Sequence, residues 1–250
     1  MPHTSSVLPR RDFLRSAAAL AATTLTVPVR GQQQSRAAAA PTLISHRCIW
    51  PARGEMRARF TGMTFFKGRW YVTFRESGEL KPNLGITEVK QGSIRVISSA
   101  DGEQWESVAY FISPGIDRKD PHITVTPDGR LMLTSITVPA PMLVWFSADG
   151  KKWTEAQPVV PHSENLWRVD WHRGTGYAIN YNYIHHTGKY EELRFYRTKD
   201  GVNFDVVCPD MLPGGYPDSG GRTAAEPNIN AAEPSLVFLE DDTCYALVRR

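Results

Sequence analysis

The chain has 250 residues, of which 41% are hydrophobic and 22% charged, and this ordinary globular composition excludes a disordered, collagen-like or coiled-coil protein. The formal charge is +3, but the first 40 residues hold five arginines against one acid, which leaves 24 basic and 25 acidic residues after them. A nearly neutral remainder gives no electrostatic argument for nucleic acid or an anionic membrane surface. Frequent aromatic residues, glycines and prolines instead indicate a β-rich protein with many turns.

The first 40 residues have the features of an export signal. The pair Arg10-Arg11 precedes Phe13-Leu14, and a mild apolar run and four alanines follow. A basic head, a short apolar stretch and small residues for cleavage are typical of a signal peptide, and the apolar run is too short to cross a bilayer. The alternative is an arginine-rich disordered tail. We therefore expect a signal and linker over 1–40, a mature domain over 41–250 and no membrane span.

The arginine pair and the Phe-Leu after it resemble a twin-arginine signal. This resemblance implies that the Tat translocase is a partner and that the chain folds before export. The mature protein is then expected in the periplasm or outside the cell.

Cysteine usage predicts neither a metal site nor a cofactor. Cys48, Cys208 and Cys244 are odd in number and widely spaced, and they form no CxxC or Cys/His pattern. We expect buried free thiols, with one disulfide and one leftover thiol as the alternative after export. The sequence also has no glycine-rich phosphate loop and no His/Glu metal set, so no metal and no cofactor are expected.

A repeat is the most informative feature of the sequence. The pattern S-x-D-G-x-x-W occurs at 99–105 and at 147–153, and a conservative copy with Thr and Phe occupies 198–204. Successive aspartates of the motif are 48 and 51 residues apart. A period near 50 with several strands in each unit is typical of a propeller or a similar array.

Each unit divides into four predicted strands, marked by alternating apolar residues and by Asp-Gly or Lys-Gly turns. The predicted strands are 62–66, 70–75, 93–98 and 105–111, then 123–126, 131–137, 142–146 and one after Trp153, then 167–171, 177–181, 192–197 and 204–207, and finally 234–238 and 245–249. Four antiparallel strands make one propeller blade. The sequence therefore predicts an all-β propeller with three complete blades and half of a fourth.

The residue types of the motif have a local structural role. A turn Asp accepts backbone N–H bonds, a Gly adopts the positive φ that the turn needs, and the aromatic side chain can fold back onto the hairpin. Scaffold roles without chemistry are therefore assigned to Asp101, Gly102, Trp105, Asp149, Gly150, Trp153, Asp200, Gly201 and Phe204. These turns are expected on the face opposite the site.

The motif resembles the Asp box of sialidases and related propeller proteins, which is typical of the scaffold and only weakly of the activity. The surrounding sequence is similar to sialidase-like secreted bacterial proteins over about 46–250. The matching segments are 60–62, 70–76, 94–97, 116–121, 126–133, 166–172 and 246–250. The resemblance implies six blades, which need roughly 300 residues at this period. About 210 residues follow the signal, so we expect an N-terminal portion of a longer protein.

Propeller geometry indicates which face would hold a site. Inner strands line the central axis, and the loops that lead into them open on one face with those that join second and third strands. The side chains at these positions are Arg57, Arg59, Arg75, Glu76, 118–122, Trp167, Arg168, 181–186, 226–233, Arg249 and Arg250. Arg pairs bidentately with carboxylates and stays charged when desolvated, so this composition suits an anionic sugar.

The resemblance implies a catalytic scheme with a Tyr nucleophile assisted by a Glu, an Asp as acid/base and three arginines on the sugar carboxylate. Glu233 begins a predicted strand and Arg249 ends the paired one 16 residues later, which matches the assisting Glu and one arginine of sialidases. Arg250 is the alternative to Arg249. Both candidates could instead be solvated strand ends.

The first arginine of the triad would be Arg57 or Arg59, and Arg75 is a rival at the end of the next strand. The usual Arg-Ile-Pro signature is absent, because Phe and Thr follow Arg59. No Asp lies over 76–92, where the acid/base is expected, so Asp120 is the nearest substitute and a turn cap is its structural alternative. The nucleophilic Tyr and the third arginine have no counterpart in the sequence.

Aromatic side chains offer a surface for sugar contact. We expect Trp167 and Tyr183 to bind substrate, the latter beside His185-His186. The alternative for Trp167 is a core position, because residues 166–171 alternate in polarity. Metal binding by the adjacent histidines is not expected.

Three functions remain open. The first is an exported glycoside hydrolase of the exo-α-sialidase type, whose N-terminal portion alone is expected to be inactive. The second is a non-catalytic Asp-box propeller that binds glycans or protein partners, and the third is an interaction propeller of an envelope complex. A sialylated or other acidic glycan is the expected partner in the first case.

Replacing Arg10 and Arg11 together by Lys should leave precursor in the cytoplasm, because the translocase reads the arginine pair. The measurement is an immunoblot of cytoplasmic and periplasmic fractions. Arg36→Lys, in the same segment but outside the pair, is the control. An unchanged periplasmic yield of the double variant would remove the twin-arginine interpretation.

Overall fold

The computed structural model describes residues 44–51, 56–78, 91–139, 141–159, 161–162, 165–180, 193–211 and 232–249. The chain divides into a unit that ends at His46 and a second unit, Arg47–Arg250, that contains every described strand. The predicted export signal, Tyr183, the His185-His186 pair and Arg250 lie outside the described residues. Within the described ranges, no helix has the length and apolar character needed to cross a membrane.

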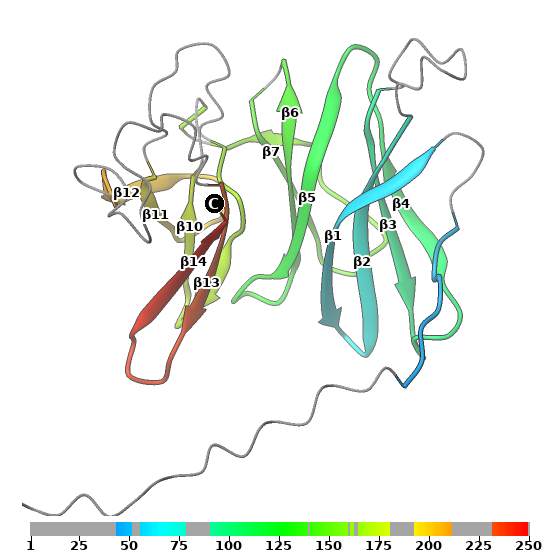
Figure 1. The fold of residues 1–250 in the computed structure, drawn as a ribbon, viewed down its shortest axis with the longest axis horizontal. Coiled ribbons are helices and arrows are strands. Elements are labelled where there is room, and N and C mark those ends of the chain that lie inside the picture. Colours follow the sequence, from blue (N-terminus) through cyan, green and yellow to red (C-terminus); the bar gives the residue numbers. More distant parts are fainter. Residues whose placement is uncertain are drawn as a thin grey trace, which may run out of the picture. The chain divides into compact units, whose positions relative to one another are not determined.

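All described elements are strands, and they form successive antiparallel sheets (Figure 1). The first sheet pairs β1 (Arg57–Phe66), β2 (Arg69–Ser77), β3 (Ser93–Ser99) and β4 (Glu106–Phe111) in that order. The second pairs β5 (Asp117–Val125), β6 (Leu131–Val138), β7 (Leu143–Ser147) and β8 (Gln157–Pro158). The third pairs β9 (Asp170–His172), β10 (Thr175–Ile179), β11 (Phe195–Thr198) and β12 (Phe204–Cys208), and the last pairs β13 (Ala232–Phe238) with β14 (Cys244–Arg249). The predicted all-β propeller, with three complete blades and half of a fourth, is confirmed.

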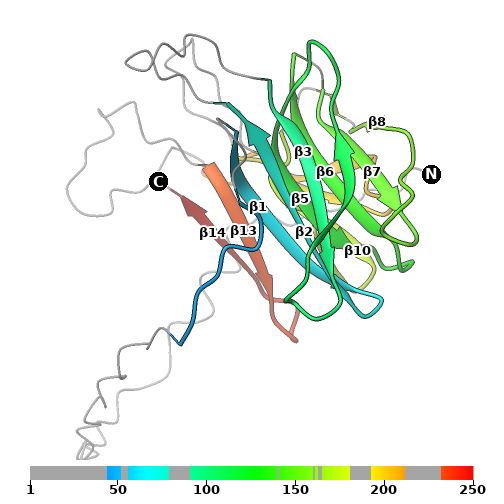
Figure 2. The same cartoon turned by 90° about the vertical axis from the view of Figure 1, so that its right-hand side faces the viewer.

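Apolar cores join each sheet to the next, and the first sheet lies in front of the second in Figure 2. Successive side chains of a strand point to opposite faces. On β6, Leu131 and Leu133 therefore pack toward the first sheet, whereas Met132 between them packs toward the third. Leu236 of β13 continues the series by packing against Ile179 of the third sheet. A blade between two others is thus buried on both faces, which explains why β6 is buried from Leu131 to Thr137.

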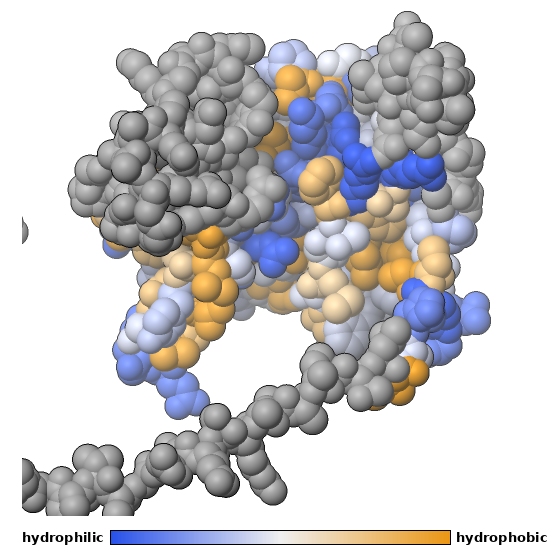
Figure 3. Space-filling view, viewed as in Figure 1, coloured by the Kyte–Doolittle hydropathy of each residue, from blue (hydrophilic) through white to orange (hydrophobic). Residues whose placement is uncertain are grey.

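The two end sheets keep apolar side chains exposed. On the first sheet, Met63 and Phe65 are 63% and 52% exposed, and on the fourth, Tyr245 and Leu247 are 57% and 68% exposed. Figure 3 shows hydrophobic residues gathered over β13 and β14. Trp50, from the segment before β1, covers part of the first sheet by packing near Phe74 at 6.1 Å between ring centroids.

The repeated Asp-Gly turn joins the third and fourth strands of each complete blade. Asp101 Oδ1 accepts the backbone N–H groups of Glu103 and Gln104 at 2.7 and 2.8 Å, and Ser99 Oγ accepts that of Gly102 at 2.8 Å. The same bonds recur at 2.8–2.9 Å around Asp149 and Asp200. The N–H groups of Gln104 and Glu103 hold the pKa of Asp101 at about 2. These carboxylates therefore serve the backbone of their own turn.

The aromatic residue of each motif packs against the sheets. Trp105 lies in the core with Phe74, and the ring of Trp153 meets that of Phe111 edge-on at 5.6 Å. Phe204 is 7% exposed in the core between the second and third sheets. The motif thus anchors its hairpin on apolar surface, as the residue types suggest.

The motif glycines of the second and third blades also allow their turns to pack on the preceding blade. A Cβ on Gly150 would lie 2.2 Å from Tyr71 Oη of β2, and one on Gly201 would lie 2.8 Å from Met132 Sδ of β6. A Cβ on Gly102 would meet no atom within 4 Å. All three glycines have φ between 74° and 77°. Gly150 and Gly201 therefore meet two requirements, the left-handed backbone and the close approach, whereas Gly102 meets the first alone.

An identical bulge interrupts three of the four inner strands. In β1 the register shifts between Arg59 and Gly62, in β5 between Lys119 and His122, and in β13 between Ala232 and Ser235, each with one extra residue on the inner strand. The first bulged residue has a positive φ in every case: Phe60 at 54°, Asp120 at 46° and Glu233 at 52°. A bulge bends a strand and re-aims its side chains, and it is a place where Pro is tolerated.

These bulges correct two predicted strand boundaries. The inner strands of the first and second blades were expected to begin at 62 and 123, but β1 begins at Arg57 and β5 at Asp117. The bulge lets the ladder continue on its N-terminal side, so the strand extends beyond the irregular residues. In the third blade the reverse holds, because 167–171 was predicted and β9 comprises Asp170–His172 alone.

All three cysteines are free thiols, as expected. The prediction that they are buried is wrong. Cys48 and Cys244 are exposed and Cys208 is half-buried. They lie before the first sheet, on β12 and on β14. Outer strands and sheet ends leave these positions open to solvent.

Gly150→Ala should destabilise the fold far more than Gly102→Ala. Both variants carry the cost of a left-handed Ala, about 1–2 kcal/mol, but Gly150→Ala also forces its methyl group into Tyr71, which adds about 1–3 kcal/mol. The measurement is the free energy of unfolding in urea. Equal losses in the two variants would contradict docking of the turn on the preceding blade.

Candidate functional site

A cavity of about 220 Å³ lies where the inner strands of the first three blades meet. We call it the axial cavity. Its lining residues are Thr61, Gly62, Met63, Thr64, His122, Ile123, Thr124, Thr134, Arg168, Val169 and Asp170. They come from β1, from β5 and β6, and from the segment that begins β9. The cavity is thus adjacent to two of the bulges, through Thr61 and Gly62 of β1 and through His122 of β5.

Gly62 allows the first two inner strands to approach closely at this cavity. A Cβ on Gly62 would lie 3.3 Å from the backbone nitrogen of Ile123 and 3.4 Å from the Cα of His122. Both contacts are with backbone, which cannot move as an exposed side chain can. A larger residue would therefore push β1 and β5 apart where they line the cavity.

His122 is held in place as a neutral ring. It follows the bulge of β5, and its ring meets that of Trp167 edge-on, with 4.6 Å between centroids. Its Nε2 is buried and has no hydrogen-bond partner in the described part of the chain. Burial lowers the pKa of His122 to about 3, and the charge of Arg168 contributes. The imidazole is therefore uncharged at neutral pH and can donate or accept one hydrogen bond.

Asp170 brings a carboxylate to the same cavity. The backbone N–H of Leu236 on β13 donates to this carboxylate and so orients it from the fourth blade. Its Oδ2 atom is buried, and no described residue donates a hydrogen bond to it. Burial raises the pKa of Asp170, although the charge of Arg168 and the Leu236 N–H oppose the shift. The Oδ2 atom of Asp170 is therefore shielded from solvent and accepts no hydrogen bond from a described residue.

The two predicted carboxylates, Asp120 and Glu233, occupy the equivalent first position of their bulges. Both side chains are half-buried. Pro121 and Pro234 follow them, and neither could donate to the sheet ladder. The sequence thus places an acid at the same structural position in the second and fourth blades.

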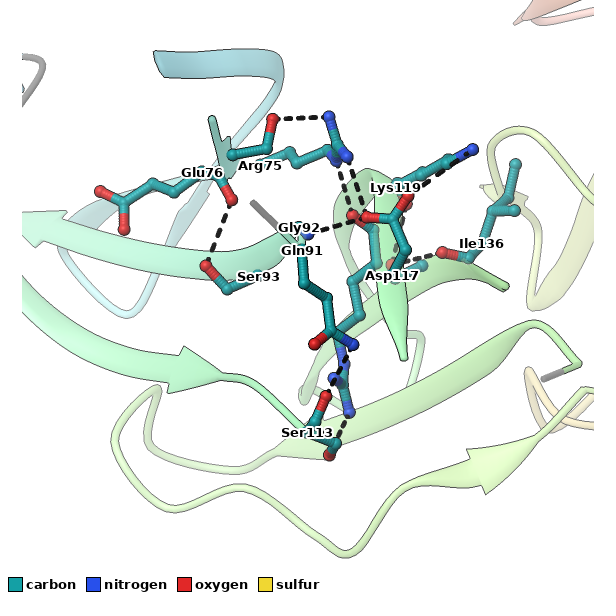
Figure 4. A network of polar contacts seen from close by, with 12 residues as sticks. Arg75, Glu76, Gln91, Gly92, Ser93, Ser113, Asp117, Lys119 and Ile136 are labelled. Carbon is teal, nitrogen blue, oxygen red and sulfur yellow. Dashed lines mark hydrogen bonds and ion pairs between the residues drawn. The ribbon is translucent and has the colours of Figure 1, made fainter. Parts of the chain in front are cut away.

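The structure gives Arg75 a different role from the predicted contact with substrate (Figure 4). Its guanidinium donates from Nη2 to Asp117 Oδ1 at 2.8 Å, from Nε to the carbonyl of Arg118 at 2.9 Å and from Nη1 to Ser77 Oγ at 2.6 Å. Burial would raise the pKa of Asp117, but the hydrogen bond and charge of Arg75 hold it below its usual range. Arg75 is 9% exposed and joins β2 to β5, so it is a structural residue between two blades.

Gly92 completes this joint. Its N–H donates to Asp117 Oδ1 at 2.8 Å, and a Cβ there would lie 2.4 Å from Arg75 Nε. Arg118 packs beside the joint over the ring of Trp145, with its Nη2 donating to Ser113 Oγ at 3.0 Å. Burial lowers the pKa of Arg118. This part of the predicted arginine cluster therefore stabilises the contact between the first and second blades.

The remaining predicted residues are distributed differently. Arg57 and Arg59 lie within β1, on the N-terminal side of its bulge, rather than in a loop. Trp167 is 8% exposed, so it supports His122 from one edge rather than offering an open stacking face. Arg249 is opposite Ala232 in the sheet register, one residue from Glu233. This pairing brings the backbones of the proposed Glu–Arg pair together.

Asp170 is the site residue that sequence reasoning missed. It was assigned to the interior of a strand over 167–171, whose polar positions were interpreted as alternation. The usable signal is the run Arg168, Asp170 and His172 on a strand among apolar residues. The side chains of an inner strand face the axis or a neighbouring blade, where little solvent is available. Charged residues on such a strand therefore indicate a functional or structural polar contact.

Within the described ranges, no group of three or more His, Cys, Asp or Glu side chains is arranged to hold a metal ion. The axial cavity can instead offer a carboxylate acceptor, a neutral imidazole, a guanidinium and several threonine hydroxyls. Figure 3 shows hydrophilic residues gathered in the region of β5, between hydrophobic ones. Such a set suits a polar, uncharged ligand that forms several hydrogen bonds.

Comparison with known proteins gives a likeness of fold. No protein-family model matches the sequence, and no curated protein matches it. A solved structure of a protein of unknown function from Dyadobacter fermentans is similar with a TM-score of 0.59 and 14% identity, over 79% of this chain and 63% of that one. A xylan β-1,4-xylosidase from Bacillus halodurans has a TM-score of 0.49 at 14% identity, over 79% of this chain and 38% of its own. The GH43 protein BlXynB from Bacillus licheniformis has a TM-score of 0.48 at 16% identity, over 77% of this chain and 37% of its own.

The chain thus spans less than two thirds of the length of these proteins. At 14% identity, the likeness to the Dyadobacter protein concerns the fold alone. It agrees with the propeller seen in the sheet topology.

Replacing His122 by Gln should reduce the acid sensitivity of the fold. The pKa of His122 is about 3 in the folded chain and about 6.5 when unfolded, so the unfolded state takes up the proton first as the pH falls below 6.5. His122 therefore lowers the free energy of unfolding by about 2–3 kcal/mol from pH 6.5 to 4.5, and Gln removes this loss. The measurement is the free energy of unfolding at several pH values. His162→Gln, at an exposed position, is the control, and identical pH profiles for His122→Gln and the unsubstituted chain would contradict the burial of a neutral ring.

Proposed function

We propose that this chain belongs to an exported glycoside hydrolase that acts at the axial face of the propeller. The observation that carries the proposal is the repeated bulge, which places Asp120 and Glu233 at the same strained position in two blades. A non-Gly residue with positive φ costs about 1–3 kcal/mol and persists where the surroundings determine it, commonly at functional sites. Glycosidases of most families use two carboxyl groups on opposite sides of the scissile bond, one of them as nucleophile or base. Sialidases are an exception with a Tyr nucleophile, and the resemblance to them still implies a Glu and an Asp at the site.

The proposed roles follow the chemistry of the two acids. Glu233 assists the attacking group by accepting its proton, and Asp120 acts as the general acid that protonates the leaving oxygen. The sialidase resemblance supports a Tyr nucleophile and an anionic sugar, for which Arg57 or Arg59 and Arg249 would bind the carboxylate. Arg75 is left out of this set, because it is 9% exposed and its Nε, Nη1 and Nη2 atoms each donate a hydrogen bond within the protein.

A glycan-binding propeller without catalysis is the second candidate. The ion pair of Arg75 with Asp117 favours this candidate, because it leaves fewer arginines to bind a sugar carboxylate. The absence of an Asp over 76–92, where the family acid is expected, points the same way. The two candidates share the axial face and differ in whether a glycosidic bond is cleaved.

Glu233→Gln and Asp120→Asn should each lower hydrolysis of an aryl glycoside by at least about 100-fold, because each removes a proton-transfer group. The substrates are an aryl α-sialoside and a panel of neutral aryl glycosides, tested with the full-length exported protein, because the N-terminal portion alone is expected to be inactive. Asp205→Asn, at an exposed position on β12, is the matched control and should keep full activity. Glycan binding at the axial face without cleavage of any substrate would favour the second candidate, and equal activity of all variants would exclude these roles.

A further inference from the structure

Arg168 presents a charged group to the axial cavity that a ligand can reach. Its side chain is exposed and lines the cavity, whereas Oδ2 of Asp170 and Nε2 of His122 are buried. A guanidinium carries five N–H donors in a planar fork, so it can bond two neighbouring oxygen atoms at once. An accessible double donor is therefore available to a ligand in this cavity.

The backbone on both sides of Arg168 is fixed. Trp167 and Val169 are 8% and 4% exposed, and the N–H of Trp167 donates to the carbonyl of Ile179 at 3.0 Å. The charge of Arg168 also opposes the rise in the pKa of Asp170, which means that the two side chains attract each other. This attraction favours a guanidinium that stays at the cavity, and a side chain restrained in this way loses less conformational freedom on binding.

The third and fourth inner strands lie side by side with a constant offset. Asp170 of β9 accepts from the N–H of Leu236 on β13, and His172 stacks on Phe238 with 4.6 Å between ring centroids. The members of both pairs are 66 residues apart in sequence. Two contacts with the same offset, on alternate residues of β9, define how the two strands are aligned.

This offset places Arg168 beside the bulge of β13 that begins at Glu233. On the other side of the third blade, Trp167 meets the ring of His122, which directly follows the bulge of β5. Arg168 is therefore level with both bulges, and its blade lies between the two blades that carry Asp120 and Glu233.

We propose that Arg168 binds the sugar at the axial face by donating from its guanidinium to two neighbouring sugar oxygens, either an adjacent pair of hydroxyl groups or a carboxylate. This inference rests on the proposed function, because it assumes that the axial face takes a sugar. It adds a contact from the third blade, to which neither proposed acid belongs. A two-point contact at this level holds the sugar between Asp120 and Glu233, as positioning of a reacting bond requires.

The test measures binding separately from hydrolysis, with the full-length exported protein. Calorimetry at neutral pH gives the affinities of methyl thioglycosides, which resist cleavage, of N-acetylneuraminic acid, glucuronic acid, galactosamine, galactose and mannose. Arg168→Gln should weaken binding of the preferred sugar by about 10-fold or more, because hydrogen bonds from a charged group are lost. Arg168→Lys should restore part of this loss, because Lys keeps the charge without the planar fork. Arg197→Gln, the same change at an exposed position on β11, is the matched control and should leave the affinity unchanged.

Ligand analogues identify the two oxygens and give a readout that a merely structural role would not move. If Arg168 binds a carboxylate, the amide of that sugar should lose most of the difference in affinity between the unsubstituted protein and Arg168→Gln. If Arg168 binds two hydroxyl groups, the analogue without one of them should do so instead. A loss in Arg168→Gln that persists undiminished with every amide and deoxy analogue would overturn the inference.

The outcomes separate this inference from the proposed function. Hydrolysis of a glycoside with an unchanged KM in Arg168→Gln would overturn the inference and leave the function standing. Binding that depends on Arg168, without hydrolysis of any substrate, would support the inference and remove the enzyme. Preference for the galactosamine glycoside, whose ammonium group Arg168 would repel, would overturn the inference, as would no measurable affinity for any of the sugars.

Discussion

An extra residue in the inner strand, set in a left-handed conformation, is the local constraint on which the arrangement at the axis depends. It recurs at Phe60, Asp120 and Glu233, and in each blade the ladder resumes with the same shift of register. Because side chains alternate along a strand, one extra residue reverses the facing of every residue before it. The bulge therefore decides which side chains reach the axial cavity, and His122 follows it directly.

That constraint needs rigid blades around it. The packing of each Asp-Gly turn on the second strand of the preceding blade, through Gly150 and Gly201, fixes blades at their outer parts. The joint of Arg75, Gly92 and Asp117 fixes the first two blades nearer to the inner strands. Buried charge of this kind is costly to break, because removing one partner leaves the other unpaired in a desolvated place. The blades thus hold β1 and β5 close enough for their bulges to border one cavity.

The scaffold could be predicted from the sequence because its signals are local and repeated. The Asp-Gly turns, the hairpins and the period near 50 all act over a few residues, and the structure has four-stranded sheets where they indicate them. The site was less predictable because its determinants are not local. The predicted inner strands began at 123 and at 234, whereas β5 and β13 begin at Asp117 and Ala232 and carry Pro121 and Pro234 within them. Arg75 looks like a ligand-binding residue until its partners on β5 are known. The carboxylate of Asp170 accepts from the N–H of Leu236, which is 66 residues away in sequence.

If the proposed function is right, a sugar binds in the axial cavity, between the bulged inner strands. This can be examined in a crystal structure of the protein soaked with a neutral methyl glycoside. We expect a sugar ring in the cavity, in contact with residues of β1 and β5. A sugar bound instead at the Asp-Gly turns around Asp101, Asp149 or Asp200, with water alone in the axial cavity, would contradict it.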